Sequence, residues 1–135
     1  MIVVDSNVIA YCWINGERTA LAHRLRRLDP DWHAPLLWRS ELRNILAGYR
    51  RDGSLGSEQI RNIMTAAEAG LAGREHHLPS DRVFSIIERS RLSAYDGEFV
   101  ALAEILGVRL VTEDRAILTA CPGRAVSLGS AAVIQ

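Results

Sequence analysis

Short runs of aliphatic and β-branched residues alternate with helical segments along the whole chain. Strands are predicted at 1–4 ("MIVV"), 32–35 ("WHAP"), 74–79 ("REHHLP"), 108–112 ("VRLVT") and near 125–128 ("AVSL"). Between them, segments such as 16–28, 36–51, 57–72 and 80–91 repeat apolar residues at helical spacing. Such alternation favours an α/β fold in which a parallel sheet is covered by helices on both faces.

The composition is that of an ordinary globular protein. Hydrophobic residues make up 48% and charged residues 24% of the 135. Because no repeat or linker divides the sequence, we expect one domain over residues 1–135. No apolar run reaches the length of a membrane span, and the chain turns polar at Asp5, so we expect a cytoplasmic protein with no membrane segment. Cys12 and Cys121 are interpreted as reduced thiols.

Asp96 is the side chain that most needs an explanation. Phe99, Leu102, Ala103 and Leu106 recur at helical spacing and predict a buried helical face, which Gly107 would terminate. At about 100° per residue, Asp96 lies only about 60° from the centre of that face. A carboxylate that points toward a core is costly unless something compensates its charge.

Three further carboxylates are predicted near one edge of the sheet. Asp5 directly follows the first strand and Asp114 follows the strand at 108–112. Glu41 falls at the border of the apolar face of the 36–51 helix, near its start. In open parallel sheets the carboxyl ends of the strands carry the functional crevice.

Each acid also has a purely structural interpretation. Asp5 and Asp114 are good helix N-caps, Glu41 suits a solvated edge, and Asp96 could pair with Arg91. All four together, however, suggest a divalent cation, because grouped carboxylates repel one another and Mg²⁺ or Mn²⁺ prefers oxygen ligands. Such a site would activate water for attack on a phosphodiester.

Several other classes of protein are disfavoured. All 16 basic residues are arginine, and the missing lysine argues against a Walker A nucleotide site, a receiver-type domain or a haloacid-dehalogenase-like phosphatase. A glycine-rich nucleotide loop is also absent, since no glycine follows Asp5 before Gly16. The four histidines show no zinc pattern, and the pair His76–His77 is expected at the surface.

The formal net charge is zero, so nucleic acid would have to be held by local clusters. Two arginine clusters are candidates for contacting RNA or a protein partner, or else are solvated helix faces. They are Arg39, Arg43 and Arg50, and Arg24, Arg26 and Arg27.

The motifs together resemble the PIN-domain ribonucleases, in particular the VapC-type toxins of toxin–antitoxin pairs. The matching segments are "MIVVDSNVIAY", "SELRNIL" and "LSAYDGEFVALAEILGVRLVTED", and a short tail with a final strand. Gly97 is a slight departure, since alanine is more usual there.

The resemblance implies a three-layer α/β/α sandwich around a short parallel sheet, and an Mg²⁺-dependent endoribonuclease. It assigns Asp5, Glu41, Asp96 and Asp114 to the acidic catalytic pocket, with Asp5, Asp96 and Asp114 as metal ligands. Asn7 and Thr112 would be orienting residues. It also implies RNA as substrate, a homodimer, and a small antitoxin that blocks the active-site groove.

Two alternatives remain at this point. One is a PIN-like nuclease that acts on DNA or processes RNA outside a toxin–antitoxin pair. The other is a non-catalytic interaction domain that retains an acidic metal site.

Overall fold

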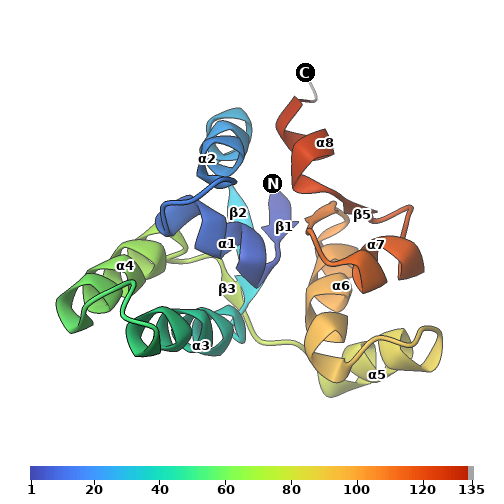
Figure 1. The fold of residues 1–135 in the computed structure, drawn as a ribbon. Coiled ribbons are helices and arrows are strands. Elements are labelled where there is room, and N and C mark those ends of the chain that lie inside the picture. Colours follow the sequence, from blue (N-terminus) through green and yellow to red (C-terminus); the bar gives the residue numbers. More distant parts are fainter. Residues whose placement is uncertain (134–135) are drawn as a thin grey trace.

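The structure is a computed structural model that describes residues 1–133. Five strands and eight helices alternate along this part of the chain (Figure 1). Their bounds are β1 (Ile2–Val4), α1 (Ser6–Trp13), α2 (Thr19–Leu28), β2 (Trp32–Pro35), α3 (Trp38–Arg51), α4 (Ser57–Gly70), β3 (Glu75–His76), α5 (Ser80–Glu88), α6 (Ala94–Leu106), β4 (Leu110–Val111), α7 (Arg115–Ala120), β5 (Ala125–Val126) and α8 (Leu128–Val133).

All five strands belong to one parallel sheet with the order β3-β2-β1-β4-β5. Val3 of β1 pairs with His33 of β2 on one side and with Leu110 of β4 on the other. After β1, the chain adds β2 and β3 on one side of it, and then β4 and β5 on its other side. The order reverses between β1 and β4, which is the place where open α/β sheets bind ligands at the carboxyl ends of their strands.

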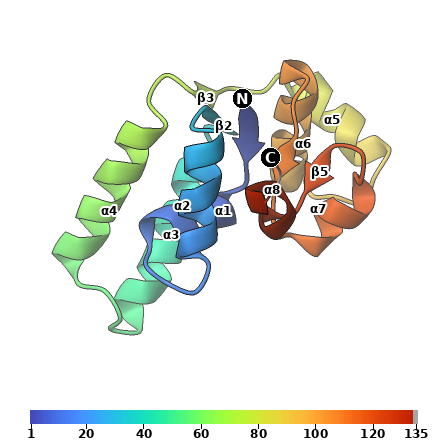
Figure 2. The same ribbon diagram turned by 90° about the horizontal axis from the view of Figure 1, so that it is seen from above.

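The helices cover the sheet from both sides, as the fold prediction required. In Figure 2, α1 to α4 lie on one side of the strands and α5 and α6 on the other, while α7 lies beside β5. Helix α8 packs against α2. The predicted three-layer α/β/α sandwich is thus confirmed.

The centre of the core lies between the sheet and α6. Residues 99–103 of α6 are all buried, because this helix packs against both the sheet and α5. Gly107 ends α6 with φ of +68°, a left-handed conformation that glycine adopts without strain. None of the helices in residues 1–133 is long and apolar enough to cross a membrane.

The structure corrects two details of the sequence interpretation. The predicted tail was to end in a strand near 125–128, but β5 covers only Ala125–Val126 and helix α8 follows it. His76 was expected at the surface, yet it is half-buried and its Nε2 lies 2.8 Å from Nδ1 of the buried His33. Cys12 and Cys121 are free thiols, as predicted.

Candidate active site

The first acid of the candidate site is fixed by the sheet itself. Asp5 directly follows β1, and its backbone N–H donates to the carbonyl of Val111 at the end of β4, at 3.0 Å. Its side chain caps α1 by accepting from the backbone N–H of Ser6 at 2.7 Å. Asp5 therefore lies at the point where the strand order reverses, at the carboxyl edge of the sheet.

The Asp5 carboxyl is buried and electrostatically strained. Its pKa rises from 3.8 to about 6, chiefly because of burial; the hydrogen bonds from Thr112 and Ser6 oppose the rise, and the nearby carboxylates of Glu41 and Asp96 add to it. A carboxyl with this pKa is held in an environment that favours either a proton or a cation beside it.

Hydrogen bonds of Thr112 and Ser6 connect the acids. The Thr112 hydroxyl donates to Asp5 Oδ2 at 2.6 Å and accepts from the backbone N–H of Asp114 at 3.0 Å. The Ser6 hydroxyl donates to Glu41 Oε1 at 2.6 Å. Because both hydroxyl residues are buried, they fix the orientation of the acids around them. Thr112 thus sits where an orienting residue was predicted.

Asp114 and Asp96 complete the acidic set from two helix starts. Asp114 caps α7, since its Oδ1 accepts from the backbone N–H of Ile117 at 3.1 Å. Asp96 lies in the first turn of α6, which Ser93 caps. Burial raises the pKa of Asp96, and the charges of Asp114 and Glu41 raise it further.

The ion pair considered between Asp96 and Arg91 is not present. Within residues 1–133, no ion pair reaches the half-buried carboxylate of Asp96. The structural interpretation of Asp5 and Asp114 as N-caps is correct as well. The four predicted acids nevertheless act electrostatically on one another, as members of one cluster do.

The chemistry of this donor set fits a hard divalent cation. The set offers carboxylate oxygens, and the pKa values of Asp5 and Asp96 are raised by burial and by the neighbouring carboxylates, which a bound cation would counter. In residues 1–133, however, no three His, Cys, Asp or Glu side chains are close enough together to hold a metal ion as they stand. The cluster is thus electrostatically suited to a cation without being a preformed cage.

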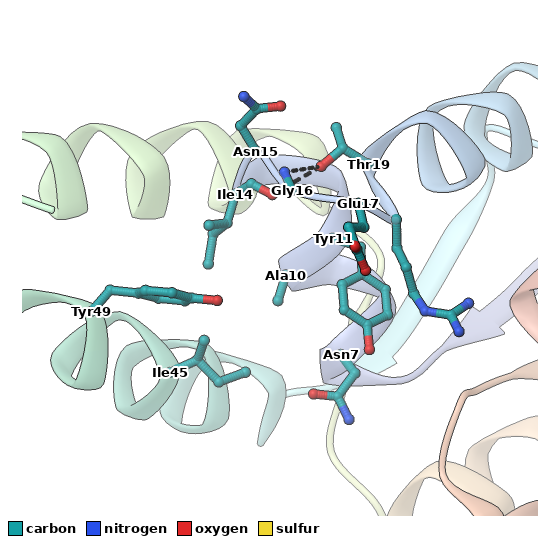
Figure 3. A pocket seen from close by; sticks show the side chains of 11 residues that line it. Asn7, Ala10, Tyr11, Ile14, Asn15, Gly16, Glu17, Thr19, Ile45 and Tyr49 are labelled. Carbon is teal, nitrogen blue, oxygen red and sulfur yellow. Dashed lines mark hydrogen bonds between the residues drawn. The ribbon is translucent and has the colours of Figure 1, made fainter. Parts of the chain in front are cut away.

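Asn7 lies apart from the hydrogen bonds of the cluster. It is exposed on the first turn of α1 and lines a cavity between α1 and α3 (Figure 3). Asn7 was predicted to orient the substrate; among the described residues its side chain makes no hydrogen bond to the acids.

One arginine of each cluster is engaged within the protein, whereas Arg24, Arg27, Arg43 and Arg50 are exposed. Arg39 binds Glu75 through Nε at 2.6 Å and Nη2 at 2.7 Å, and Glu68 through Nη1 at 2.9 Å. Arg26 stacks over the ring of Trp13, with 4.9 Å between its guanidinium carbon and the ring centroid. These two side chains stabilise the fold and are not simple phosphate contacts.

Comparison with known proteins supports the resemblance drawn from the motifs. The chain is 27% identical to Ribonuclease VapC3 of Pyrobaculum aerophilum over 124 residues, which is 90% of this chain and 95% of that protein. The chain resembles the VapC-type ribonucleases. No protein-family model matches it.

Two residues of this VapC-like chain were missed by sequence reasoning. Ser6 is buried and joins Asp5 to Glu41, a role that its position inside a run of good N-caps concealed. Glu98 is a fifth acid near the site: burial raises its pKa, and Glu41 raises it further. Its position two residues after Asp96, away from the apolar face, gave no signal.

Proposed function

We propose that this VapC-like chain is a metal-dependent endoribonuclease and the toxin of a toxin–antitoxin pair. The observation that carries the proposal is the mutual action of Asp5, Glu41, Asp96 and Asp114 at the reversal point of the sheet. The similarity to Ribonuclease VapC3 along nearly the whole chain supports it.

The proposed division of labour follows from the contacts. Asp5, Asp96 and Asp114 would hold Mg²⁺ or Mn²⁺, while Thr112 keeps the Asp5 carboxylate turned toward the cluster. When bound, such a cation lowers the pKa of water and stabilises the charge that develops at phosphorus. Glu41 would accept the proton of the attacking water, because the hydroxyl of Ser6 on α1 holds its carboxylate in place.

Cleavage assays with paired variants test this proposal. Purified protein is incubated with single-stranded RNA in Mg²⁺, in Mn²⁺ and in EDTA, and we expect cleavage with either metal and none in EDTA. Asp96→Asn removes a ligand charge and should abolish cleavage. Asp81→Asn is the matched control, because Asp81 also lies in the first turn of a helix but is exposed on α5. Full cleavage by Asp96→Asn, or cleavage in EDTA, would contradict the proposal.

The same assay separates the alternatives. A DNA strand of the same sequence tests for a DNA-directed nuclease, which shares the metal chemistry. Absence of cleavage on both strands, with a folded protein and added Mn²⁺, would favour a non-catalytic interaction domain.

The resemblance also leads us to propose a cytoplasmic homodimer and a small antitoxin that covers the acidic groove. Sedimentation equilibrium tests the dimer. Co-expression with a small reading frame adjacent to the gene tests the antitoxin, which should co-purify and suppress cleavage.

A further inference from the structure

A cavity of about 380 Å³ opens beside the acidic cluster, between α1 and α3. Figure 3 shows Tyr49 and Ile45 reaching from α3 toward Ile14 and Ala10, with Tyr11 further along α1. The loop before α2 closes one end of the cavity, and hydrogen bonds of Thr19 fix the conformation of this loop. The Thr19 hydroxyl donates to the carbonyl of Ile14 at 3.0 Å and accepts from the backbone N–H of Gly16 at 2.9 Å.

The walls of this cavity combine flat rings with polar groups that have no hydrogen-bond partner among the described residues. Tyr11 and Tyr49 contribute aromatic rings, and Ile14 and Ile45 contribute aliphatic surface. Within residues 1–133, the amide of Asn7 and the hydroxyls of Tyr11 and Tyr49 form no hydrogen bond. A planar ligand with donors and acceptors at its edge would satisfy both features.

The cavity lies next to the acidic cluster on both helices. Glu41, Ile45 and Tyr49 lie on successive turns of α3, so the cavity begins about 6 Å along the helix from Glu41. Asn7 lies two residues after Asp5 on the opposite wall. An RNA strand with one phosphate at the acids would therefore place a neighbouring nucleotide at the cavity.

Arg18 lines the cavity on the side of the acids. Its Nη1 lies 3.1 Å from Oε1 of Glu113, the residue before Asp114, and its guanidinium carbon lies 6.0 Å from the centroid of the Tyr11 ring. This half-exposed guanidinium can turn from Glu113 to a backbone phosphate, because arginine forks suit phosphate oxygens.

We propose that this cavity binds one unpaired nucleobase, next to the phosphate that lies at the acids. The proposal rests on the proposed ribonuclease function. The bases of single strands can splay out and stack on aromatic side chains, whereas those of an A-form duplex cannot. A peptide side chain fits less well, since it would leave the amide and both hydroxyls of the walls unpaired.

Tyr49→Leu tests the proposal, because it removes the ring and hydroxyl but keeps an apolar side chain at a position that is 39% exposed. The probe is a short single-stranded oligoribonucleotide of mixed sequence, with one 2-aminopurine placed at each position in turn, in EDTA so that no cleavage occurs. We expect quenching of 2-aminopurine at one position relative to the cleaved bond. Tyr49→Leu should lose this quenching and bind the probe about 10-fold more weakly.

Two controls keep the result specific. Phe84→Leu removes an aromatic ring that is 54% exposed on α5, away from the cavity, and should bind the probe as the wild type does. Tyr49→Phe keeps the ring and should retain the quenching. Circular dichroism verifies that each variant is folded.

The inference would be overturned by wild-type affinity and quenching in Tyr49→Leu, or by duplex RNA binding as tightly as the single strand. These outcomes differ from a failure of the proposed function. The latter would appear as absence of RNA cleavage by the wild-type protein in Mg²⁺ or Mn²⁺.

Discussion

Replacing Asp5 with asparagine should stabilise the metal-free protein at neutral pH. Below the unfolded pKa of 3.8, Asp5 is protonated in both the folded and the unfolded chain and has no effect. Between pH 3.8 and about 6, the unfolded chain ionises Asp5 while the folded protein still holds it protonated, so each further rise in pH favours unfolding; above about pH 6 the folded protein ionises as well and the loss stops growing. Stability is therefore lost across this window, and the asparagine variant escapes the loss.

The expected magnitude follows from the two pKa values. The rise from 3.8 to about 6 corresponds to about 3 kcal/mol of unfolding free energy at pH 7, at about 1.4 kcal/mol per pKa unit. The variant loses part of this gain, because its amide nitrogen would face the Thr112 hydroxyl that now donates to Asp5 Oδ2. That mismatch costs about 1 kcal/mol. We expect a net stabilisation of about 2 kcal/mol at pH 7, and a small net destabilisation at about pH 4, where the mismatch exceeds the electrostatic gain.

Urea denaturation in EDTA, from about pH 4 to about pH 8, measures this difference. The unfolding free energy of Asp5→Asn minus that of the wild type should grow up to about pH 6 and then level off. Asp81→Asn, at an exposed position, should show no such pH-dependent gain. Added Mg²⁺ should then stabilise the wild type and leave Asp5→Asn unchanged, because only the wild type keeps the ligand charge.

The reasoning would be refuted if Asp5→Asn were no more stable than the wild type at any pH. It would also be refuted by a gain that did not change with pH. Either result would mean that the Asp5 carboxylate is not under electrostatic strain, and the case for a cation at this place would lose its main physical support.

Four further predictions concern single side chains. Thr112→Val removes the hydrogen bond that lowers the pKa of Asp5, so the acid limb of the pH profile of kcat/KM should move up by about one pH unit, while Thr112→Ser keeps it. Gly97→Ala should raise the unfolding free energy by about 0.5–1 kcal/mol, because the added Cβ has room 3.4 Å or more from its neighbours. Gly70→Ala should lower it by about 1–3 kcal/mol, because its Cβ would lie 2.5 Å from a tryptophan ring. Burial and a neighbouring histidine lower the pKa of His76, so stability should fall as pH drops below about 6.5, and His76→Gln should flatten that fall in urea denaturation.

The sequence could predict the layers and the strands because these depend on local patterns. Each strand is a short aliphatic or β-branched run bounded by turn residues, and all five predicted strands are present. Helix α8 could not be predicted in this way. Its residues are small and its buried side chains are only Leu128 and Ala132, which pack in a helix that contacts α2, far away in the sequence. Tertiary contact therefore decides its conformation.

Local patterns also could not predict which side chains pair with each other. The helical period places Arg39 on a polar face, but not beside Glu75, which arrives on β3 after 36 further residues. The same holds for His76, whose neighbour His33 comes from the adjacent strand β2. Periodicity defines which face of an element a side chain occupies; which charged group lies opposite depends on the arrangement of the elements.

The structural and the functional interpretations of the four acids describe the same geometry. Asp5 and Asp114 cap α1 and α7, and Glu41 and Asp96 lie in the first turns of α3 and α6. The positive ends of these helix dipoles offset part of the repulsion among the carboxylates. This explains how the metal-free cluster persists within a stable fold. The burial that raises the pKa of Asp5 and Asp96 shows that the helix ends offset this strain only in part, and the remaining deficit of positive charge is what a divalent cation would fill.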